Sequence, residues 1–67
     1  MKRNETLIAA RKQSGKTQKQ VAKEIGIAES AYQRYEHGRC IPNVITGNLI
    51  ARVLDTTSEK IWGYKLI

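Results

Sequence analysis

A set of polar residues in the middle of the chain recurs at helical spacing and carries varied hydrogen-bonding groups: Ser30, Gln33, Arg34 and His37. Their i, i+3, i+4 and i+7 spacing places them on one side of a helix. In a DNA major groove, Gln33 can pair bidentately with adenine, and Arg34 can pair with guanine or hold a phosphate. His37 is expected to interact with its own helix C-terminus rather than with a phosphate. We call these four residues the polar stripe, and they are the first candidates for a surface that recognises bases.

The charge of the chain is strongly positive and unevenly placed. Twelve Lys and Arg against six Asp and Glu give a net charge of +6 and a pI near 9.8. Residues 1–39 hold nine basic and four acidic side chains, so five of the six net charges precede Cys40. This balance favours nucleic acid or an anionic membrane surface as partner. The membrane is the weaker alternative, because no strongly amphipathic basic helix and no apolar run of roughly 20 residues is present.

The composition argues against an enzyme. The 67 residues make a single domain, 1–67, with no room for a deep active site. One His, one Cys and a lone aspartate, Asp55, supply neither a nucleophile with its base nor a metal-ligand cluster. We therefore expect no catalysis, cofactor, metal or small-molecule ligand. Cys40 cannot form an intramolecular disulfide, which fits a cytoplasmic protein.

Helical signals recur along the chain and no segment alternates long enough for a strand, so the expected fold class is all-α with five helices. These helices are expected at about 5–14, 17–26, 29–37 and 43–54, with a short one that starts at 56–59. Their inward positions are expected to be Leu7, Ile8, Ala10, Val21, Ala22, Ile25, Tyr32, Tyr35, Val44, Ile50, Ala51, Val53, Leu54, Ile61 and Trp62.

The second and third expected helices form a helix-turn-helix unit over about 17–37. Thr17 and Gln20 make a capping box that starts the first helix of this unit, and Gly26 lies in the turn. The second helix of such a unit enters a DNA major groove. The polar stripe lies on that helix, opposite Tyr32 and Tyr35, so it would face the DNA.

The chain resembles the phage-repressor family of helix-turn-helix proteins, the lambda Cro and cI type, also called Xre-like regulators. The resemblance spans almost the whole chain without an insertion in the turn and the helix after it. It implies a compact five-helix, lambda-repressor-like domain that binds a two-fold symmetric operator as a dimer and regulates transcription. The residues that carry it are Arg11, Thr17-Gln18, Val21-Ala22, Ile25-Gly26-Ile27, Ser30, Arg34, Glu36, Gly38, Pro42, Ala51, Leu54 and Ile61-Trp62-Gly63.

The resemblance also implies roles for individual side chains. Arg11 and Glu36 match a structural ion pair, and Gln18 matches a residue that contacts a phosphate and braces the recognition helix. For Glu29, a base contact and a favourable interaction with the helix dipole remain equal alternatives. The residues at base-facing or groove-facing positions are Glu29, Ser30, Gln33 and Arg34.

Phosphate contacts are expected around the stripe, where cations and helix starts commonly meet the DNA backbone. Such contacts fix the register of a protein on DNA rather than its sequence preference. For any one of these lysines alone, a solvated surface charge is the more common role, so the cluster carries the expectation. The expected set is Lys16, Thr17, Gln18, Lys19, Arg39 and Asn43.

Several positions depart from the family pattern. Ala28 stands where a capping Ser, Thr or Asn is usual, so the recognition helix should lack a side-chain cap. Lys16 replaces an apolar residue, with its stem expected on the core and its ammonium in water. Gly47 and Asn48 stand at usually apolar sites and are expected to weaken the packing of the fourth helix. Marginal stability of the monomer would follow, which favours a partner subunit.

The sequence thus predicts a sequence-specific transcriptional repressor of phage or prophage type, acting in the cytoplasm of a bacterial or phage-infected cell. A homodimer would bind double-stranded DNA at an inverted-repeat operator. Because the chain ends soon after the fifth helix, we expect no further domain, as in Cro. The alternative is an antitoxin or anti-repressor type of module that binds a protein partner. The residues expected at a dimer or partner contact are Trp62, Tyr64, Leu66 and Ile67.

Overall fold

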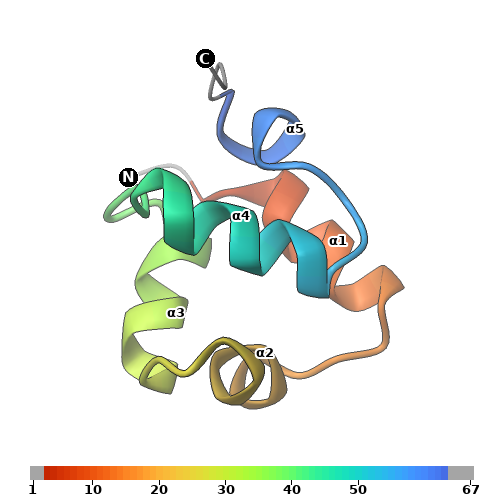
Figure 1. Cartoon of the computed structure of the whole chain (residues 1–67), viewed down its shortest axis with the longest axis vertical. Coiled ribbons are helices and arrows are strands. Elements are labelled where there is room, and N and C mark those ends of the chain that lie inside the picture. Colours follow the sequence, from red (N-terminus) through yellow and green to blue (C-terminus); the bar gives the residue numbers. More distant parts are fainter. Residues whose placement is uncertain (1–2, 64–67) are drawn as a thin grey trace.

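The computed structural model describes residues 3–63, and over these residues the chain is helical with no strand. The chain order is α1 (Glu5–Gln13), α2 (Gln18–Ile25), α3 (Glu29–Glu36), α4 (Val44–Val53) and α5 (Ser58–Trp62) (Figure 1). The predicted all-α class with five helices is therefore confirmed, and the predicted boundaries differ from the observed ones by about two residues or fewer. Tyr64, Leu66 and Ile67 lie outside the described residues.

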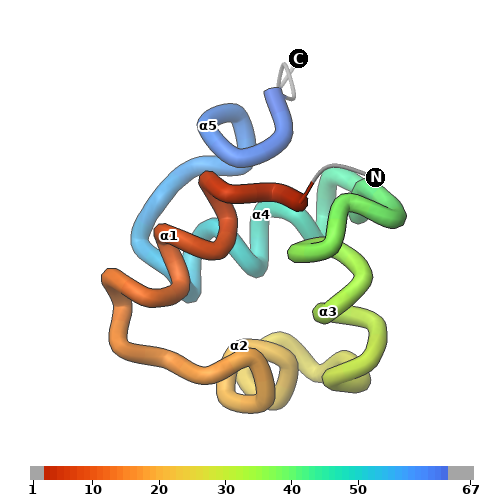
Figure 2. The backbone as a smooth tube through the Cα atoms, turned by 180° about the vertical axis from the view of Figure 1, so that it is seen from behind, coloured from red at the N-terminus to blue at the C-terminus, as the bar shows by residue number. Residues whose placement is uncertain are grey.

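The helices surround a single core. α4 runs between α2 and α5, which lie at opposite ends of the molecule, and α1 crosses behind it (Figures 1 and 2). α3 packs against α1 and α2, while α5 packs against α1 and α4. The residues at the centre come from all five helices: Leu7, Val21, Ala22, Tyr32, Ile50, Ala51, Leu54 and Ile61.

Each of the helices α1, α2, α4 and α5 begins with a side-chain cap, and the capping box at Thr17 is the one that the sequence predicts. The Thr17 hydroxyl accepts from the Gln20 amide N–H at 3.1 Å, and the Gln20 side chain accepts from the Thr17 N–H at 2.8 Å. Asn4, Asn43 and Thr57 cap α1, α4 and α5 by the same kind of bond. These caps satisfy amide groups that have no partner inside a helix.

The turn between α2 and α3 depends on Gly26. Its φ of +77° lies in the left-handed region, where only glycine adopts the conformation without steric cost. The Ile27 N–H then donates to the Ala22 carbonyl at 3.0 Å, which closes the end of α2. The chain is extended at Ala28 and enters α3 one residue later. A three-residue turn therefore sets the angle of α3 against α2.

The core differs from the sequence expectation on α4. Val44, at the first position of α4, was expected to be buried but is 45% exposed. Gly47 and Asn48 do not interrupt the helix: Gly47 is buried, and the Asn48 side chain accepts from the Ser58 hydroxyl at 2.6 Å. Tyr32 is fully buried, and Tyr35, Val53 and Trp62 pack partly buried around the core, as expected.

A group of large apolar side chains lies on the outside, around the start of α4. We call it the α4 apolar patch, and it consists of Ile41, Val44, Ile45 and Leu49. Ile45 is the most exposed member at 75%. A hollow of about 770 Å³ between α4 and α5, lined in part by Ile45 and Leu49, adjoins the patch. None of the helices in residues 3–63 has the length and apolarity to cross a membrane.

The start of α3 offers a direct test of how helix caps stabilise this fold. Ala28 has the extended backbone of an N-cap (φ −68°, ψ 145°) but no side-chain oxygen to accept an amide bond. We expect Ala28→Ser to stabilise the domain by about 0.5 to 2 kcal/mol. Denaturant unfolding of both proteins measures this difference.

Thr17→Ala is the matched control, because it removes an existing cap and should destabilise the domain by a similar amount. An Ala28→Ser protein no more stable than the original chain would show that the start of α3 gains nothing from a cap.

Candidate nucleic-acid interface

The two faces of α3 differ sharply in exposure. Tyr32 and Glu36 are buried against the other helices, at 0% and 2% exposure. The opposite side carries Ser30, Arg34 and His37, which are exposed, and Gln33, which is half-buried. Glu29, at the first position of α3, is also exposed. The polar stripe therefore lies on the outer face of a helix whose inner face is fixed in the core.

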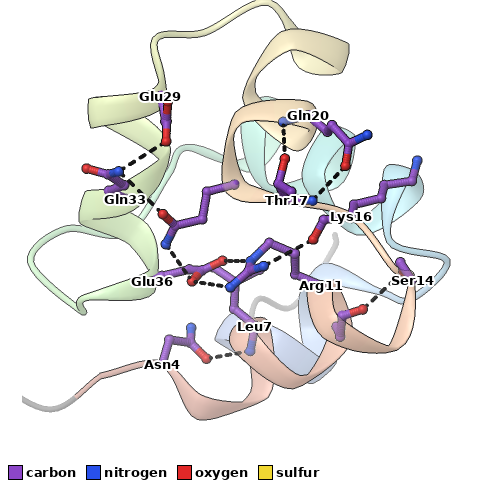
Figure 3. Close-up of polar contacts among 12 residues, drawn as sticks. Asn4, Leu7, Arg11, Ser14, Lys16, Thr17, Gln20, Glu29, Gln33 and Glu36 are labelled. Carbon is purple, nitrogen blue, oxygen red and sulfur yellow. Dashed lines mark hydrogen bonds and ion pairs between the residues drawn. The ribbon is translucent and has the colours of Figure 1, made fainter.

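Arg11 of α1 and Glu36 of α3 form the ion pair that the resemblance implies. Arg11 Nε donates to Glu36 Oε2 at 2.5 Å, and Arg11 NH2 donates to Glu36 Oε1 at 3.3 Å (Figure 3). Arg11 NH1 also donates to the carbonyl of Lys16 at 3.1 Å. One guanidinium thus joins α1, the segment before α2 and the end of α3.

The environment of Glu36 keeps it ionised although it is buried. Burial alone would raise the pKa of Glu36, but hydrogen bonds from Arg11 and Gln18 outweigh burial and hold the pKa below its usual range. The bond to Glu36 in turn raises the pKa of Arg11. Burial raises the pKa of the neighbouring Tyr32 phenol, and the Glu36 carboxylate beside it raises that pKa further.

Gln18 connects this ion pair to the outer face of α3. Its Nε2 donates to Glu36 Oε1 at 3.0 Å, and its Oε1 accepts from Gln33 Nε2 at 3.3 Å. Gln33 Nε2 also donates to Glu29 Oε2 at 3.3 Å (Figure 3). We call the series Arg11, Glu36, Gln18, Gln33 and Glu29 the amide relay. Gln18 braces α3, and it does so by joining a buried carboxylate to the polar stripe.

Only part of the amide relay could be predicted from the sequence. Glu29 and Gln33 stand at i, i+4, a spacing that brings side chains together on a helix, but their bond was not predicted. The Gln18–Gln33 contact joins two helices, and no spacing rule within a single helix could find it.

The expected phosphate contacts divide into two groups. Lys19 and Arg39 are exposed, as is Lys23 in the last turn of α2. The Lys16 ammonium, expected in water, pairs with Glu24 at 2.9 Å, while Thr17 and Asn43 use their side-chain oxygens as helix caps. The second group would therefore approach DNA with side chains that already have partners within the protein.

The structure is that of a helical domain with a short α2–turn–α3 unit. The outer face of α3 carries several kinds of polar side chain and lies in the basic half of the chain. Together these features define a DNA-binding class of protein. The helix-turn-helix family matches residues 7–61, and the chain belongs to this family. It is thus a helix-turn-helix DNA-binding domain, and the family is one of DNA-binding regulators rather than of enzymes.

One curated relative is similar to this chain over nearly the whole of its length. The cryptic phage CTXphi transcriptional repressor RstR of Vibrio cholerae serotype O1 (strain ATCC 39315 / El Tor Inaba N16961) is 38% identical over 63 residues. The aligned region covers 94% of this chain but 56% of the relative, so the chain spans a little over half of that protein. No solved structure matches the chain.

Removal of the Arg11 guanidinium should expose how much the fold depends on the ion pair. Because the pKa of Glu36 is lower in the folded state than unfolded, the pair stabilises the fold above the unfolded pKa of about 4.3, and this contribution is lost as the pH falls through the folded pKa. In Arg11→Met the buried carboxylate lacks its counter-charge, so we expect a loss of about 3 to 5 kcal/mol at pH 7. The loss should shrink as Glu36 is protonated in acid.

Denaturant unfolding between pH 3 and 7 measures both effects. Lys12→Met is the control, since it removes a positive charge from an exposed position of the same helix, outside the ion pair, and should leave the pH dependence unchanged. A cost for Arg11→Met that is the same at both ends of the pH range would contradict the assigned role of Glu36.

Proposed function

We propose that this protein is a sequence-specific transcriptional repressor of phage or prophage origin that binds an inverted-repeat operator as a homodimer. α3 lies in the major groove and its outer face reads the bases. The observation that carries this proposal is the pairing of a fully buried inner face, Tyr32 and Glu36, with an exposed polar outer face on the same helix. A recognition helix needs both, because its side chains must reach bases from a fixed support.

In this proposal Ser30, Gln33 and Arg34 contact the bases, and Glu29 lies beside them at the groove-facing start of α3. Arg34 is exposed and can donate two parallel bonds to O6 and N7 of guanine. A bidentate pair of this kind discriminates against other bases by about 1 to 3 kcal/mol. Ser30 can bond to a base edge or to a phosphate, and its short side chain permits a close approach.

The DNA backbone contacts come from cations and amides around α2 and after α3. Lys19 and Arg39 are exposed, and Gln18 retains a second N–H on Nε2 for a phosphate while the first bonds to Glu36. Neutralised phosphates release counter-ions, so this part of the affinity falls with salt and is similar for all sequences.

The proposal of repression follows the relative, which is named as a phage transcriptional repressor. A domain that occupies its operator in the cytoplasm of a bacterial or phage-infected cell blocks transcription where operator and promoter overlap. The protein-binding alternative was expected to use Trp62, which packs against the core, and the segment 64–67, which lies outside the described residues.

The homodimer in this proposal uses the α4 apolar patch. Exposed apolar groups that lie together on a small domain mark an interaction surface. A two-fold axis through the patch would bring the same residues of two copies together, as a self-complementary interface requires. An inverted-repeat operator requires the two copies of α3 to enter successive major grooves about 34 Å apart.

Two substitutions distinguish the recognition of bases from the general electrostatic attraction to DNA. Arg34→Ala should weaken binding to the selected operator by about 1 to 3 kcal/mol and relax the preference at one base pair per half-site. Lys19→Ala should weaken binding to every duplex and reduce the salt slope by about one unit. Titrations against operator and scrambled duplexes at several salt concentrations measure both. If Arg34→Ala affects the two duplexes equally, α3 does not read bases through this residue.

A charge within the apolar patch tests the dimer. Ile45→Glu places a carboxylate at the most exposed member of the patch and should convert the dimer to a monomer. Sedimentation measures this, and half-site spacing in the selected operator reports it independently. Ala9→Glu is the control, since Ala9 is exposed on α1, away from the patch. An Ile45→Glu protein that dimerises as well as the control would place the interface elsewhere.

A further inference from the structure

We infer that Gln33 reads its base with its carbonyl oxygen alone and therefore selects bases that present an amine in the major groove, adenine or cytosine. Glu29 is the positioning residue that imposes this selection. The inference rests on the proposed role of α3 as the DNA-reading helix and specifies what one position of that helix recognises.

The Gln33 amide nitrogen already has as many hydrogen-bond acceptors as it has N–H groups. An amide nitrogen carries two N–H groups, and Gln33 Nε2 donates to Gln18 Oε1 and to Glu29 Oε2, each at 3.3 Å. The Gln33 Oε1 points away from Gln18 and Glu29 and has no hydrogen bond among the described residues (Figure 3). The group left for a base is an acceptor.

The orientation of the Gln33 amide follows from the groups around it. The Glu36 carboxylate only accepts hydrogen bonds, so Gln18 must present Nε2 to Glu36 and Oε1 to Gln33. Gln33 must then turn Nε2 towards Gln18. The Glu29 carboxylate, which also only accepts, requires the same orientation independently. Two carboxylates therefore fix the amide from opposite ends of the relay.

This arrangement replaces the bidentate adenine pair expected from the sequence. That pair needs Oε1 to accept from adenine N6 and Nε2 to donate to adenine N7. Release of an N–H of Gln33 to N7 would exchange a charge-assisted bond to Glu29 for a bond to a neutral acceptor. Gln33 instead accepts from N6 of adenine or N4 of cytosine, while guanine and thymine present oxygen acceptors at the same place.

The test uses the full chain and begins with an operator selected from random duplexes. The base pair read by Gln33 is the one whose preference is lost in Gln33→Ala. At that position we compare adenine, cytosine, 7-deazaadenine, which lacks N7, and purine, which lacks the amine. Adenine, cytosine and 7-deazaadenine should bind within about threefold of one another, while purine should bind about five- to tenfold more weakly, the net value of one hydrogen bond.

Glu29→Ala tests the positioning residue. It frees one N–H of Gln33, so adenine should become preferred over cytosine and 7-deazaadenine should lose about five- to tenfold in affinity relative to adenine. Glu59→Ala on α5 removes the same charge far from α3 and should leave the ratios among the four bases unchanged. Ratios between bases cancel the general gain in DNA affinity that follows the loss of a negative charge.

The outcomes distinguish this inference from the proposed function. A large loss on 7-deazaadenine in the original chain, or unchanged base ratios in Glu29→Ala, overturns the carbonyl-only reading while operator binding stands. An operator in which Gln33→Ala alters no position also overturns it. If no operator can be selected, the DNA-reading role of α3 and the inference fail together.

Discussion

The Arg11–Glu36 ion pair is the interaction on which the rest of this structure depends. Glu36 ends α3 inside the core, and a carboxylate that is 2% exposed requires a counter-charge and further donors. Arg11 supplies the charge from α1, Gln18 supplies an amide from α2, and the Glu36 carbonyl accepts from the Asn4 N–H at 2.9 Å. Three helices must meet at one point for these bonds to form. A buried pair of this kind adds less to stability than its charges suggest, but it fixes how α3 sits on the domain.

The recognition helix is therefore held unequally along its length. Its last turn is fixed by Glu36 and its centre by Tyr32, while its first turn has an uncapped start at Ala28 and exposed side chains at Glu29 and Ser30. The bond from Gln33 to Gln18 compensates in part, because it ties the middle of the outer face to α2. Of the residues on the groove-facing side of α3, Glu29 and Ser30 thus stand on the less constrained first turn, while Gln33 and Arg34 stand on the turns that are fixed from behind.

Local rules predicted the helices well because each boundary has a local cause. The Thr17 capping box and the left-handed Gly26 begin and end α2 by contacts within a few residues. Burial of Tyr32 opposite the polar stripe follows from helical periodicity. Exposure of Val44 did not follow from the same rule, since periodicity identifies an apolar face but not whether another helix reaches far enough to cover it.

The candidate site was predictable in its residues but not in its hydrogen bonds. The sequence and the family resemblance placed Gln18, Gln33 and Glu29 near DNA, yet an amide can turn either way and only its partners decide which group is left to a ligand. Those partners come from different helices, so the orientation of the amide is determined only once the chain has folded. The Lys16–Glu24 pair, with its residues eight positions apart, is another example.

The amide relay also explains why Glu29 places a negative charge on a surface that is assigned to DNA. A carboxylate near phosphates is unfavourable unless it serves another group, and here it accepts from Gln33. Five net positive charges in residues 1–39 exceed this local repulsion and supply attraction to any duplex. Glu29 adds nothing to that attraction, and its contribution is selective, because a Gln33 side chain that offers only an acceptor disfavours bases that offer acceptors. In the proposed function, general affinity thus comes from basic residues such as Lys19 and Arg39, while base selection comes from the outer face of α3, from Arg34 and from Gln33 as Glu29 positions it.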